Sequence, residues 1–145
     1  MKMITNTRKL MAAVMLSVCT LTANGQNNEI KSDRIASLQV VAGDDWLSPP
    51  VMILGGDEPI TISFDDMTHE YHRYAYRIEH CEADWTTSDA LFTSDYCEGF
   101  TDGNTIDDVR KSLNTNVLYT HYRLRIPNER CNIKMSGNYR VTIYD

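Results

Sequence analysis

The fold is decided most clearly by residues 118–126, which read LYTHYRLRI. One face of this stretch carries Leu118, Thr120, Tyr122, Leu124 and Ile126, and the other carries Tyr119, His121, Arg123 and Arg125. Alternation with a period of two is typical of a β-strand with one buried face. Residues 60–64, 74–80 and 139–144 alternate in the same way and are rich in the β-branched and aromatic residues that strands favour. These runs predict an all-β domain.

Weaker signals lie between these strands. Residues 37–42 and 51–54 are shorter strand candidates, and residues 85–116 form a long, loop-rich stretch. Acidic residues at 107–108 followed by basic ones at 110–111 favour a short helix over 106–113. Turn-forming residues separate the strands at Pro49-Pro50, Gly55-Gly56-Asp57, Pro127-Asn128 and Ser136-Gly137-Asn138. Short strands without intervening long helices predict a β-sandwich.

The last strand candidate carries a more specific pattern. Residues 136–141 read SGNYRV, a tight turn followed by a tyrosine and alternating apolar residues. This pattern is typical of the penultimate strand of immunoglobulin-like domains, in which the tyrosine hydroxyl bonds back to the preceding corner. Tyr139 is therefore a candidate tyrosine corner with a structural role. Because the sequence stops at Asp145, we expect an immunoglobulin-like sandwich that lacks its last strand or completes its sheet elsewhere.

The N-terminus has the layout of a secretory signal peptide. Lys2, Arg8 and Lys9 precede an apolar run over 10–23, and small residues stand at Ala23 and Gly25. The run is shorter than the roughly 20 residues that span a membrane. We predict a signal peptide over 1–25, a flexible mature N-terminus over 26–34 and one sandwich domain over 35–145.

Two other interpretations of the N-terminus remain open at this point. Cys19 ends the stretch LSVC and loosely fits a lipobox, so it is a candidate lipidated cysteine. The apolar run could instead form a buried N-terminal helix.

Charge limits the classes of partner. Three of the 14 basic side chains and none of the 20 acidic ones lie in residues 1–25, which leaves 11 basic against 20 acidic and a net charge of −9. Nucleic acids and anionic lipids both need a basic surface, so we expect neither as a partner. The mature chain has no second apolar stretch of spanning length, so we expect no membrane span in it.

Reactive residues are present but do not form a known motif. Cys81, Cys97 and Cys131 are an odd number without CxxC spacing, so the disulfide pairing stays open. His69 and His72 would point to opposite faces of a strand, and so would His80 and Cys81, so metal binding or thiol catalysis at these residues and at His121 is the weaker alternative. The adjacent acids Asp44-Asp45 and Asp65-Asp66 are more often solvated turn residues than a catalytic pair facing across a cleft, so carboxylate catalysis is weaker as well. Calcium capture by the acidic loops is another weak alternative. We predict no catalytic residue, no cofactor and no metal.

Aromatic residues in the long loop region are the better functional candidates. Trp85, Phe92, Tyr96 and Phe100 are the candidate partner contacts, because aromatic side chains bring large contact area to interfaces. Trp85 and Phe100 could alternatively pin the loop to the core, whereas we expect Tyr96 or Phe92 to point outward.

Seven short motifs carry a family resemblance. In chain order they read SFDD (63–66), IEHCEADW (78–85), YCEGF (96–100), SLNT (112–115), YTHY (119–122), IPN (126–128) and SGNY (136–139). The series resembles the N-terminal domain of the type IX secretion system plug protein family, formerly a domain of unknown function, over roughly 35–145. The resemblance implies a periplasmic, immunoglobulin-like module that binds an outer-membrane translocon barrel at its inner mouth and helps to seal it.

The sequence departs from this family in length. Family members usually continue into a further strand and a larger C-terminal region, so a truncated chain is an interpretation of this sequence. An alternative function is a glycan-binding or accessory sandwich domain of an exported polysaccharide-handling system, which would share the fold, the acidity and the loop aromatics.

Overall fold

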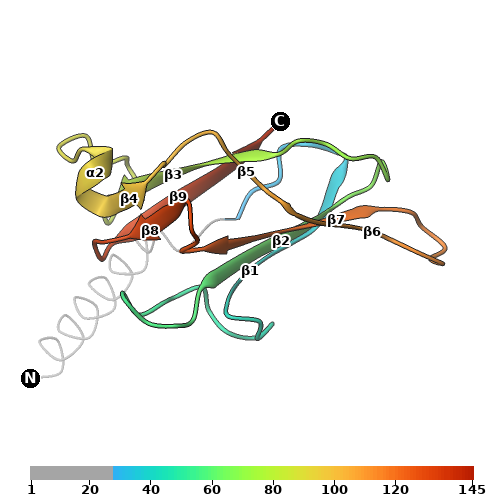
Figure 1. Cartoon of the computed structure of the whole chain (residues 1–145), viewed down its shortest axis with the longest axis horizontal. Helices are drawn as coiled ribbons and strands as arrows, with labels where there is room; N and C mark the ends of the chain where they lie inside the picture. The colour runs from blue at the N-terminus through green and yellow to red at the C-terminus, as the bar shows by residue number, and fades with distance from the viewer. Residues whose placement is uncertain (1–27) are drawn as a thin grey trace, which may run out of the picture.

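A computed structural model describes residues 28–145 of the chain (Figure 1). The predicted signal peptide and Cys19 lie outside the described residues. The described elements are β1 (Ile35–Ala42), β2 (Ile60–Asp66), β3 (Ala75–Cys81), α2 (Thr93–Tyr96), β4 (Cys97–Gly99), β5 (Asn104–Thr105), β6 (Asp108–Lys111), β7 (Thr120–Ile126), β8 (Cys131–Ile133) and β9 (Asn138–Tyr144). The prediction of an all-β domain is confirmed.

The strands form two main antiparallel sheets. The larger sheet has the order β1-β2-β7-β6, and the second has the order β5-β3-β9. Figure 1 shows them as separate layers, with β3 and β9 above β2 and β7. A small third sheet pairs β4 with β8. The first sheet has the order of the A, B, E and D strands of an immunoglobulin domain, and β3 and β9 take the places of C and F.

The core lies between the layers and is built from the alternating faces. Phe64 of β2 stacks on Tyr122 of β7 with ring centroids 5.2 Å apart, and Tyr74 meets both rings edge-on. Ile62 and Ile78 come from the two different layers and belong to the same buried cluster. Aromatic pairs of this kind add about 0.5–1.5 kcal/mol beyond the area that they bury.

Two predictions of local structure are wrong. Residues 51–54 form an exposed loop rather than a strand, because the prolines before them and the glycines after them interrupt strand pairing. Residues 106–113 contain β6 instead of a helix, since Asp108–Lys111 pairs with Thr120–Arg123 of β7. Pairing with β7 therefore outweighs the weak local preference of these residues for a helix. The long loop region does hold a short helix, but at α2.

Tyr139, the candidate tyrosine corner, lies at the start of β9. Its hydroxyl donates to the backbone carbonyl of Met135 at 2.7 Å, which ties the start of β9 to the preceding corner. Burial raises the pKa of Tyr139 to about 12, so the phenol stays protonated and remains a donor.

The structure resolves the cysteine pairing left open by the sequence. Cys97 and Cys131 form a disulfide that links β4 to β8, with their Cα atoms 6.2 Å apart. Cys81 is free and buried, and burial raises the pKa of its thiol. Cys81 therefore behaves as a small apolar core residue.

Candidate functional site

The predicted contact aromatics do not form one cluster. Phe92 and Phe100 are 77% and 73% exposed, whereas Tyr96 is only 6% exposed and packs against His80 and Tyr139. Of the two residues expected to point outward, Phe92 does and Tyr96 does not. Tyr96 precedes Cys97, whose disulfide lies in the core, and its side chain is buried beside it. The alternative that Phe100 packs on the core and fixes the loop there is wrong, because its side chain is exposed. Partner contact stays a prediction, now for Phe92 and Phe100.

Trp85 lies in the turn after β3. It adopts a positive φ of 67°, and its backbone N–H donates to the carbonyl of Glu82 at 3.0 Å. Its backbone carbonyl also accepts a hydrogen bond from the Arg140 guanidinium of β9. These contacts give Trp85 a role in holding the turn on the second sheet.

The β1–β2 loop, residues 43–59, exposes several large apolar side chains. Trp46, Leu47, Val51 and Ile53 are each at least 73% exposed. The sequence contained a signal for this loop, because five consecutive apolar or proline residues over 50–54 show no alternation and are followed by two glycines. Residues 51–54 of this run also resemble a short strand, so the pattern alone does not predict an exposed loop.

The loop presents these side chains from an ordered turn. The Asp45 carboxylate accepts hydrogen bonds from the backbone N–H of Leu47 at 3.1 Å and from the Ser48 hydroxyl at 3.0 Å. The Gly56 N–H donates to the Ile53 carbonyl at 2.9 Å, which closes a second turn. Apolar side chains held outward in this way are a mark of interaction surfaces.

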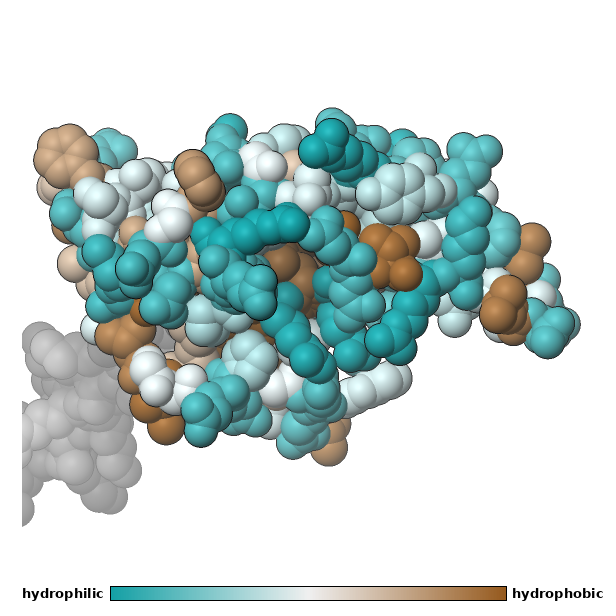
Figure 2. Space-filling model, in the orientation of Figure 1, coloured by the Kyte–Doolittle hydropathy of each residue, from teal (hydrophilic) through white to brown (hydrophobic). Residues whose placement is uncertain are grey.

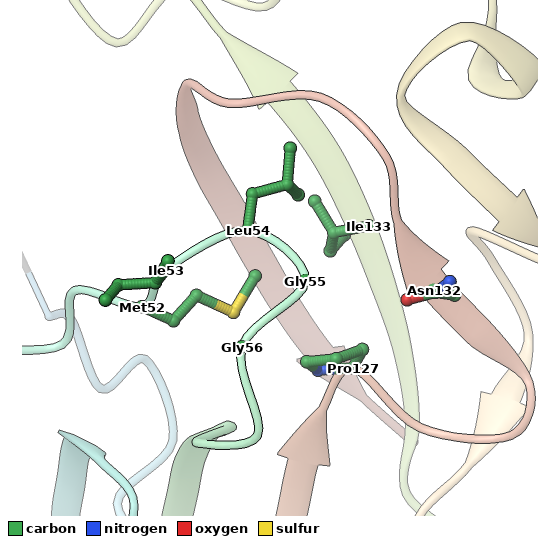
Figure 3. A pocket seen from close by; sticks show the side chains of 8 residues that line it. All are labelled: Met52, Ile53, Leu54, Gly55, Gly56, Pro127, Asn132 and Ile133. Atoms are coloured by element: carbon green, nitrogen blue, oxygen red, sulfur yellow. The ribbon is translucent and has the colours of Figure 1, made fainter.

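A small hollow lies where this loop meets the body of the sandwich. Figure 3 shows Met52 and Leu54 of the loop across from Pro127, Asn132 and Ile133. The hollow has a volume of about 210 Å³ and no ionisable lining residue. It is smaller than typical ligand pockets of roughly 300–1,000 Å³, so we interpret it as a packing seam under the loop.

A second exposed apolar segment lies at one end of the long axis. The β6–β7 hairpin exposes Leu113, Val117 and Leu118. Figure 1 shows this hairpin at the end opposite α2, with the β1–β2 loop on the lower side, and Figure 2 shows hydrophobic side chains at both ends of the molecule. The two ends offer separate contact surfaces.

A buried acidic cluster is the strongest candidate for chemistry in the described residues. Asp66 is fully buried, and its Oδ1 accepts from the backbone N–H and the hydroxyl of Thr68 at 2.9 and 2.7 Å. Its Oδ2 accepts from the Tyr74 hydroxyl at 2.7 Å and lies 2.8 Å from His72 Nδ1. Each carboxylate oxygen therefore has at least two polar partners, which gives Asp66 a structural role.

The electrostatics of this cluster favour a charged carboxylate. Burial alone would raise the pKa of Asp66, but the hydrogen bonds from Thr68 and Tyr74, together with His72, hold it below its usual range. Burial and the bond to Asp66 raise the pKa of Tyr74. Asp66 therefore joins the end of β2 to the segment before β3.

The remaining histidines have separate partners. His121 contacts Asp65 at 2.7 Å, His80 contacts Ser88 at 2.8 Å, and His69 contacts the Tyr119 carbonyl at 3.2 Å. No group of three or more metal-binding side chains occurs within residues 28–145.

Basic residues on the outer face of the larger sheet are paired. Arg125 binds Asp44 at 3.1 Å, and Arg123 lies 4.0 Å from the same carboxylate. The two guanidinium groups therefore share one carboxylate.

These features define a class of protein. The described residues form an immunoglobulin-like β-sandwich with apolar side chains on its surface loops. Residues 35–145 match the family described as "Type 9 secretion system plug protein 1st domain", and the chain belongs to this family.

Comparison with solved structures supports the assignment. The crystal structure of a hypothetical protein from Parabacteroides merdae is 43% identical, with a TM-score of 0.77. The match covers 81% of this chain and 29% of that protein, so the chain spans less than a third of its relative. No curated protein matches the sequence.

Family membership gives the chain a role associated with type IX secretion, in a family of non-catalytic secretion components. It also implies an exported protein associated with the cell envelope. Within residues 28–145, no helix is long and apolar enough to cross a membrane.

Proposed function

We propose that this chain is a periplasmic binding module of the type IX secretion system, which contacts the inner mouth of the outer-membrane translocon barrel and helps to keep it sealed. Residues 1–25 act as the export signal and are removed. Family membership over 35–145 supports this function.

The observation that carries the proposal is the exposed β1–β2 loop. A few buried aromatic or aliphatic anchors usually supply most of the energy of a protein interface. Trp46, Leu47 and Ile53 are such anchors, displayed without a partner in the isolated chain. Phe92 and Phe100 add two further contacts on other loops.

Co-purification from detergent-solubilised cell envelopes tests this function. An affinity-tagged chain retains a large β-barrel protein, whereas the double variant Leu47→Asp, Ile53→Asp loses it. The matched control is Leu113→Asp, Leu118→Asp, which places the same charges on the β6–β7 hairpin and keeps the barrel. Equal retention by both variants would exclude the β1–β2 loop as the contact.

Sealing needs a separate measurement. Cells that contain only the loop variant should admit a large antibiotic that normally does not cross the outer membrane, and cells with the control variant should not. Retention on immobilised polysaccharide with no barrel in the eluate would favour the glycan-binding alternative instead.

A further inference from the structure

Charge is unevenly distributed along this acidic chain. Residues 82–100, which include α2 and β4, contain five acidic side chains and no basic one, whereas residues 109–123 of the β6–β7 hairpin contain three basic side chains and no acidic one. Figure 1 shows α2 and this hairpin at opposite ends of the long axis. The expectation that no anionic lipid binds rests on net charge, so it does not extend to the hairpin.

The tip of the hairpin, residues 113–118, is uncharged and half apolar. It reads LNTNVL, and Leu113, Val117 and Leu118 are 82%, 58% and 51% exposed. These aliphatic side chains come from both legs of the hairpin. Large apolar side chains that are exposed together mark an interaction surface.

The hairpin tip has an ordered backbone. Below it, β6 and β7 pair as far as Lys111↔Thr120. The Ser112 N–H then donates to the Tyr119 carbonyl at 2.9 Å, and the Tyr119 N–H donates to the Ser112 hydroxyl at 2.9 Å. Within the tip, the Thr115 hydroxyl donates to the Val117 carbonyl at 2.7 Å. Docking through the tip therefore does not have to order the loop first, which lowers the entropic cost of binding.

Basic side chains lie at the base of the tip. Lys111 is exposed, and within residues 28–145 it has no ion-pair partner. The Arg110 side chain is 72% exposed and lies 3.4 Å from Asp108, in a surface ion pair of the kind that contributes little. Positive charge is therefore available within three residues of Leu113.

The β2–β3 loop, residues 67–74, packs beside this base. His69 Nδ1 lies 3.2 Å from the Tyr119 carbonyl oxygen. The loop adds Tyr71, which is 58% exposed, and tyrosine is enriched where proteins meet lipid headgroups. Its exposed Arg73 and Glu70 offset each other, so the positive charge of this end comes from the hairpin.

This combination of features fits a lipid surface. A bilayer interface takes aliphatic side chains into the headgroup region and places lipid phosphates beside basic ones. Three residues on each leg of the tip reach roughly 10 Å, and interfacial segments are buried by about 5–10 Å. A folded acidic partner would need a pocket that receives side chains from both legs, whereas a fluid interface adapts to the tip.

We propose that the tip of the β6–β7 hairpin docks the protein on the surface of a bilayer that contains anionic phospholipid. Leu113, Val117 and Leu118 enter the headgroup region, and Arg110 and Lys111 contact lipid phosphates. The contact is peripheral, and it is independent of the barrel contact proposed for the β1–β2 loop.

Vesicle flotation of the unmodified chain is the first test. The chain is purified after export, without residues 1–25, because their basic and apolar side chains would bind vesicles directly. Vesicles of two parts phosphatidylcholine and one part phosphatidylglycerol should bind the chain, and phosphatidylcholine alone should bind it at least about tenfold more weakly. Salt at about 0.5 M should release it. Equal binding to both compositions, or none at low salt, would overturn the proposal.

Two double variants separate this site from the barrel contact. Leu113→Asp, Leu118→Asp should weaken vesicle binding at least about tenfold, because aspartate is repelled by anionic lipid and does not enter the interface. Leu47→Asp, Ile53→Asp adds the same charges to another exposed loop and should bind vesicles as the unmodified chain does. The first variant keeps the barrel and loses the vesicles, and the second does the reverse, so failure of one proposal is distinguishable from failure of the other. Equal vesicle binding by the two variants would overturn the docking site.

Charge removal tests the basic residues without changing the apolar tip. Arg110→Gln, Lys111→Gln should weaken binding to the anionic vesicles about tenfold or more. The matched control Lys31→Gln, Lys134→Gln removes two exposed positive charges elsewhere and should retain binding. An equal loss in the control would mean that total charge, rather than the hairpin, drives binding, and would overturn the proposal.

Fluorescence identifies the end that enters the lipid. On anionic vesicles, Leu113→Trp should gain emission at shorter wavelength that brominated phosphatidylcholine quenches, relative to the unmodified chain with Trp46 and Trp85. Phe92→Trp, beside α2 at the opposite end, should show neither change. Binding to soluble polyglutamate without quenching of Leu113→Trp on vesicles would favour an acidic protein partner and overturn the proposal.

Discussion

The centre of the sandwich and its β1–β9 side are built from the same kind of strand but reach different degrees of burial. At the centre, Tyr122 and Ile78 are almost completely buried, because strands flank β7 and β3 on both edges. At the β1–β9 side, Val40 and Val141 alternate equally well with polar neighbours but are only partly buried.

The difference shows that an alternating pattern specifies which face of a strand is apolar, and not how completely that face is covered. Coverage depends on the neighbours that the topology supplies. The predictions below compare the covered centre with the open side, beginning with the largest expected effect.

Phe64→Ala at the covered centre should lower the free energy of unfolding by about 3–5 kcal/mol, because it removes a ring that stacks on Tyr122 and leaves a cavity. Denaturant titration with a fluorescence readout measures the change. A loss below about 1 kcal/mol would mean that the two layers are loosely packed.

Replacing both Cys97 and Cys131 with serine should lower stability by about 2–4 kcal/mol. The disulfide joins residues 34 positions apart and so reduces the conformational entropy of the unfolded chain. The single variant Cys81→Ala is the control for thiol chemistry, since it leaves that link intact and keeps a small apolar residue in the core. Reduction of the unmodified chain should reproduce the loss seen in the double variant.

Asp66→Asn should lower stability at neutral pH by about 1–3 kcal/mol, because it disturbs a saturated buried cluster. The pKa of Asp66 is lower in the folded chain than in the unfolded one. Its contribution is therefore fully present above about pH 4 and is lost as the pH falls through the lower folded pKa.

The free energy of unfolding, measured as the pH is lowered, tests the direction of this effect. Below about pH 4, stability of the unmodified chain should fall more steeply than that of Asp66→Asn. Asp89→Asn, which changes an exposed carboxylate, serves as the control. Parallel acid limbs for the unmodified chain and Asp66→Asn would contradict the assigned role.

Val141→Ala at the open side should cost less than about 1 kcal/mol, because this side chain is only partly buried and water already reaches it. A cost equal to that of Phe64→Ala would show that this side is already covered in solution.

Much of the fold could be predicted from local pattern. The strands at 60–66, 75–81, 120–126 and 138–144 follow directly from alternation, and the SGNY turn predicts the hydrogen bond of Tyr139. Failures occurred where a distant partner decided the outcome. β6 depends on pairing with β7, and Tyr96 is buried beside a disulfide whose second cysteine is 34 residues away.

The candidate surfaces were less predictable. Aromatic content drew attention to Phe92 and Phe100, but the exposed β1–β2 loop was missed because its apolar residues resemble a buried strand. Exposure depends on whether another layer covers a segment, and a linear sequence does not contain that layer.

The sequence by itself determined the all-β class, the faces of the main strands and the family resemblance, because each depends on residues close together in the chain. Only the tertiary structure decided the cysteine pairing, the saturation of Asp66 and the outward position of the β1–β2 loop. Those features arise from contacts between segments far apart in sequence, and their energies depend on which surfaces the completed sheets cover.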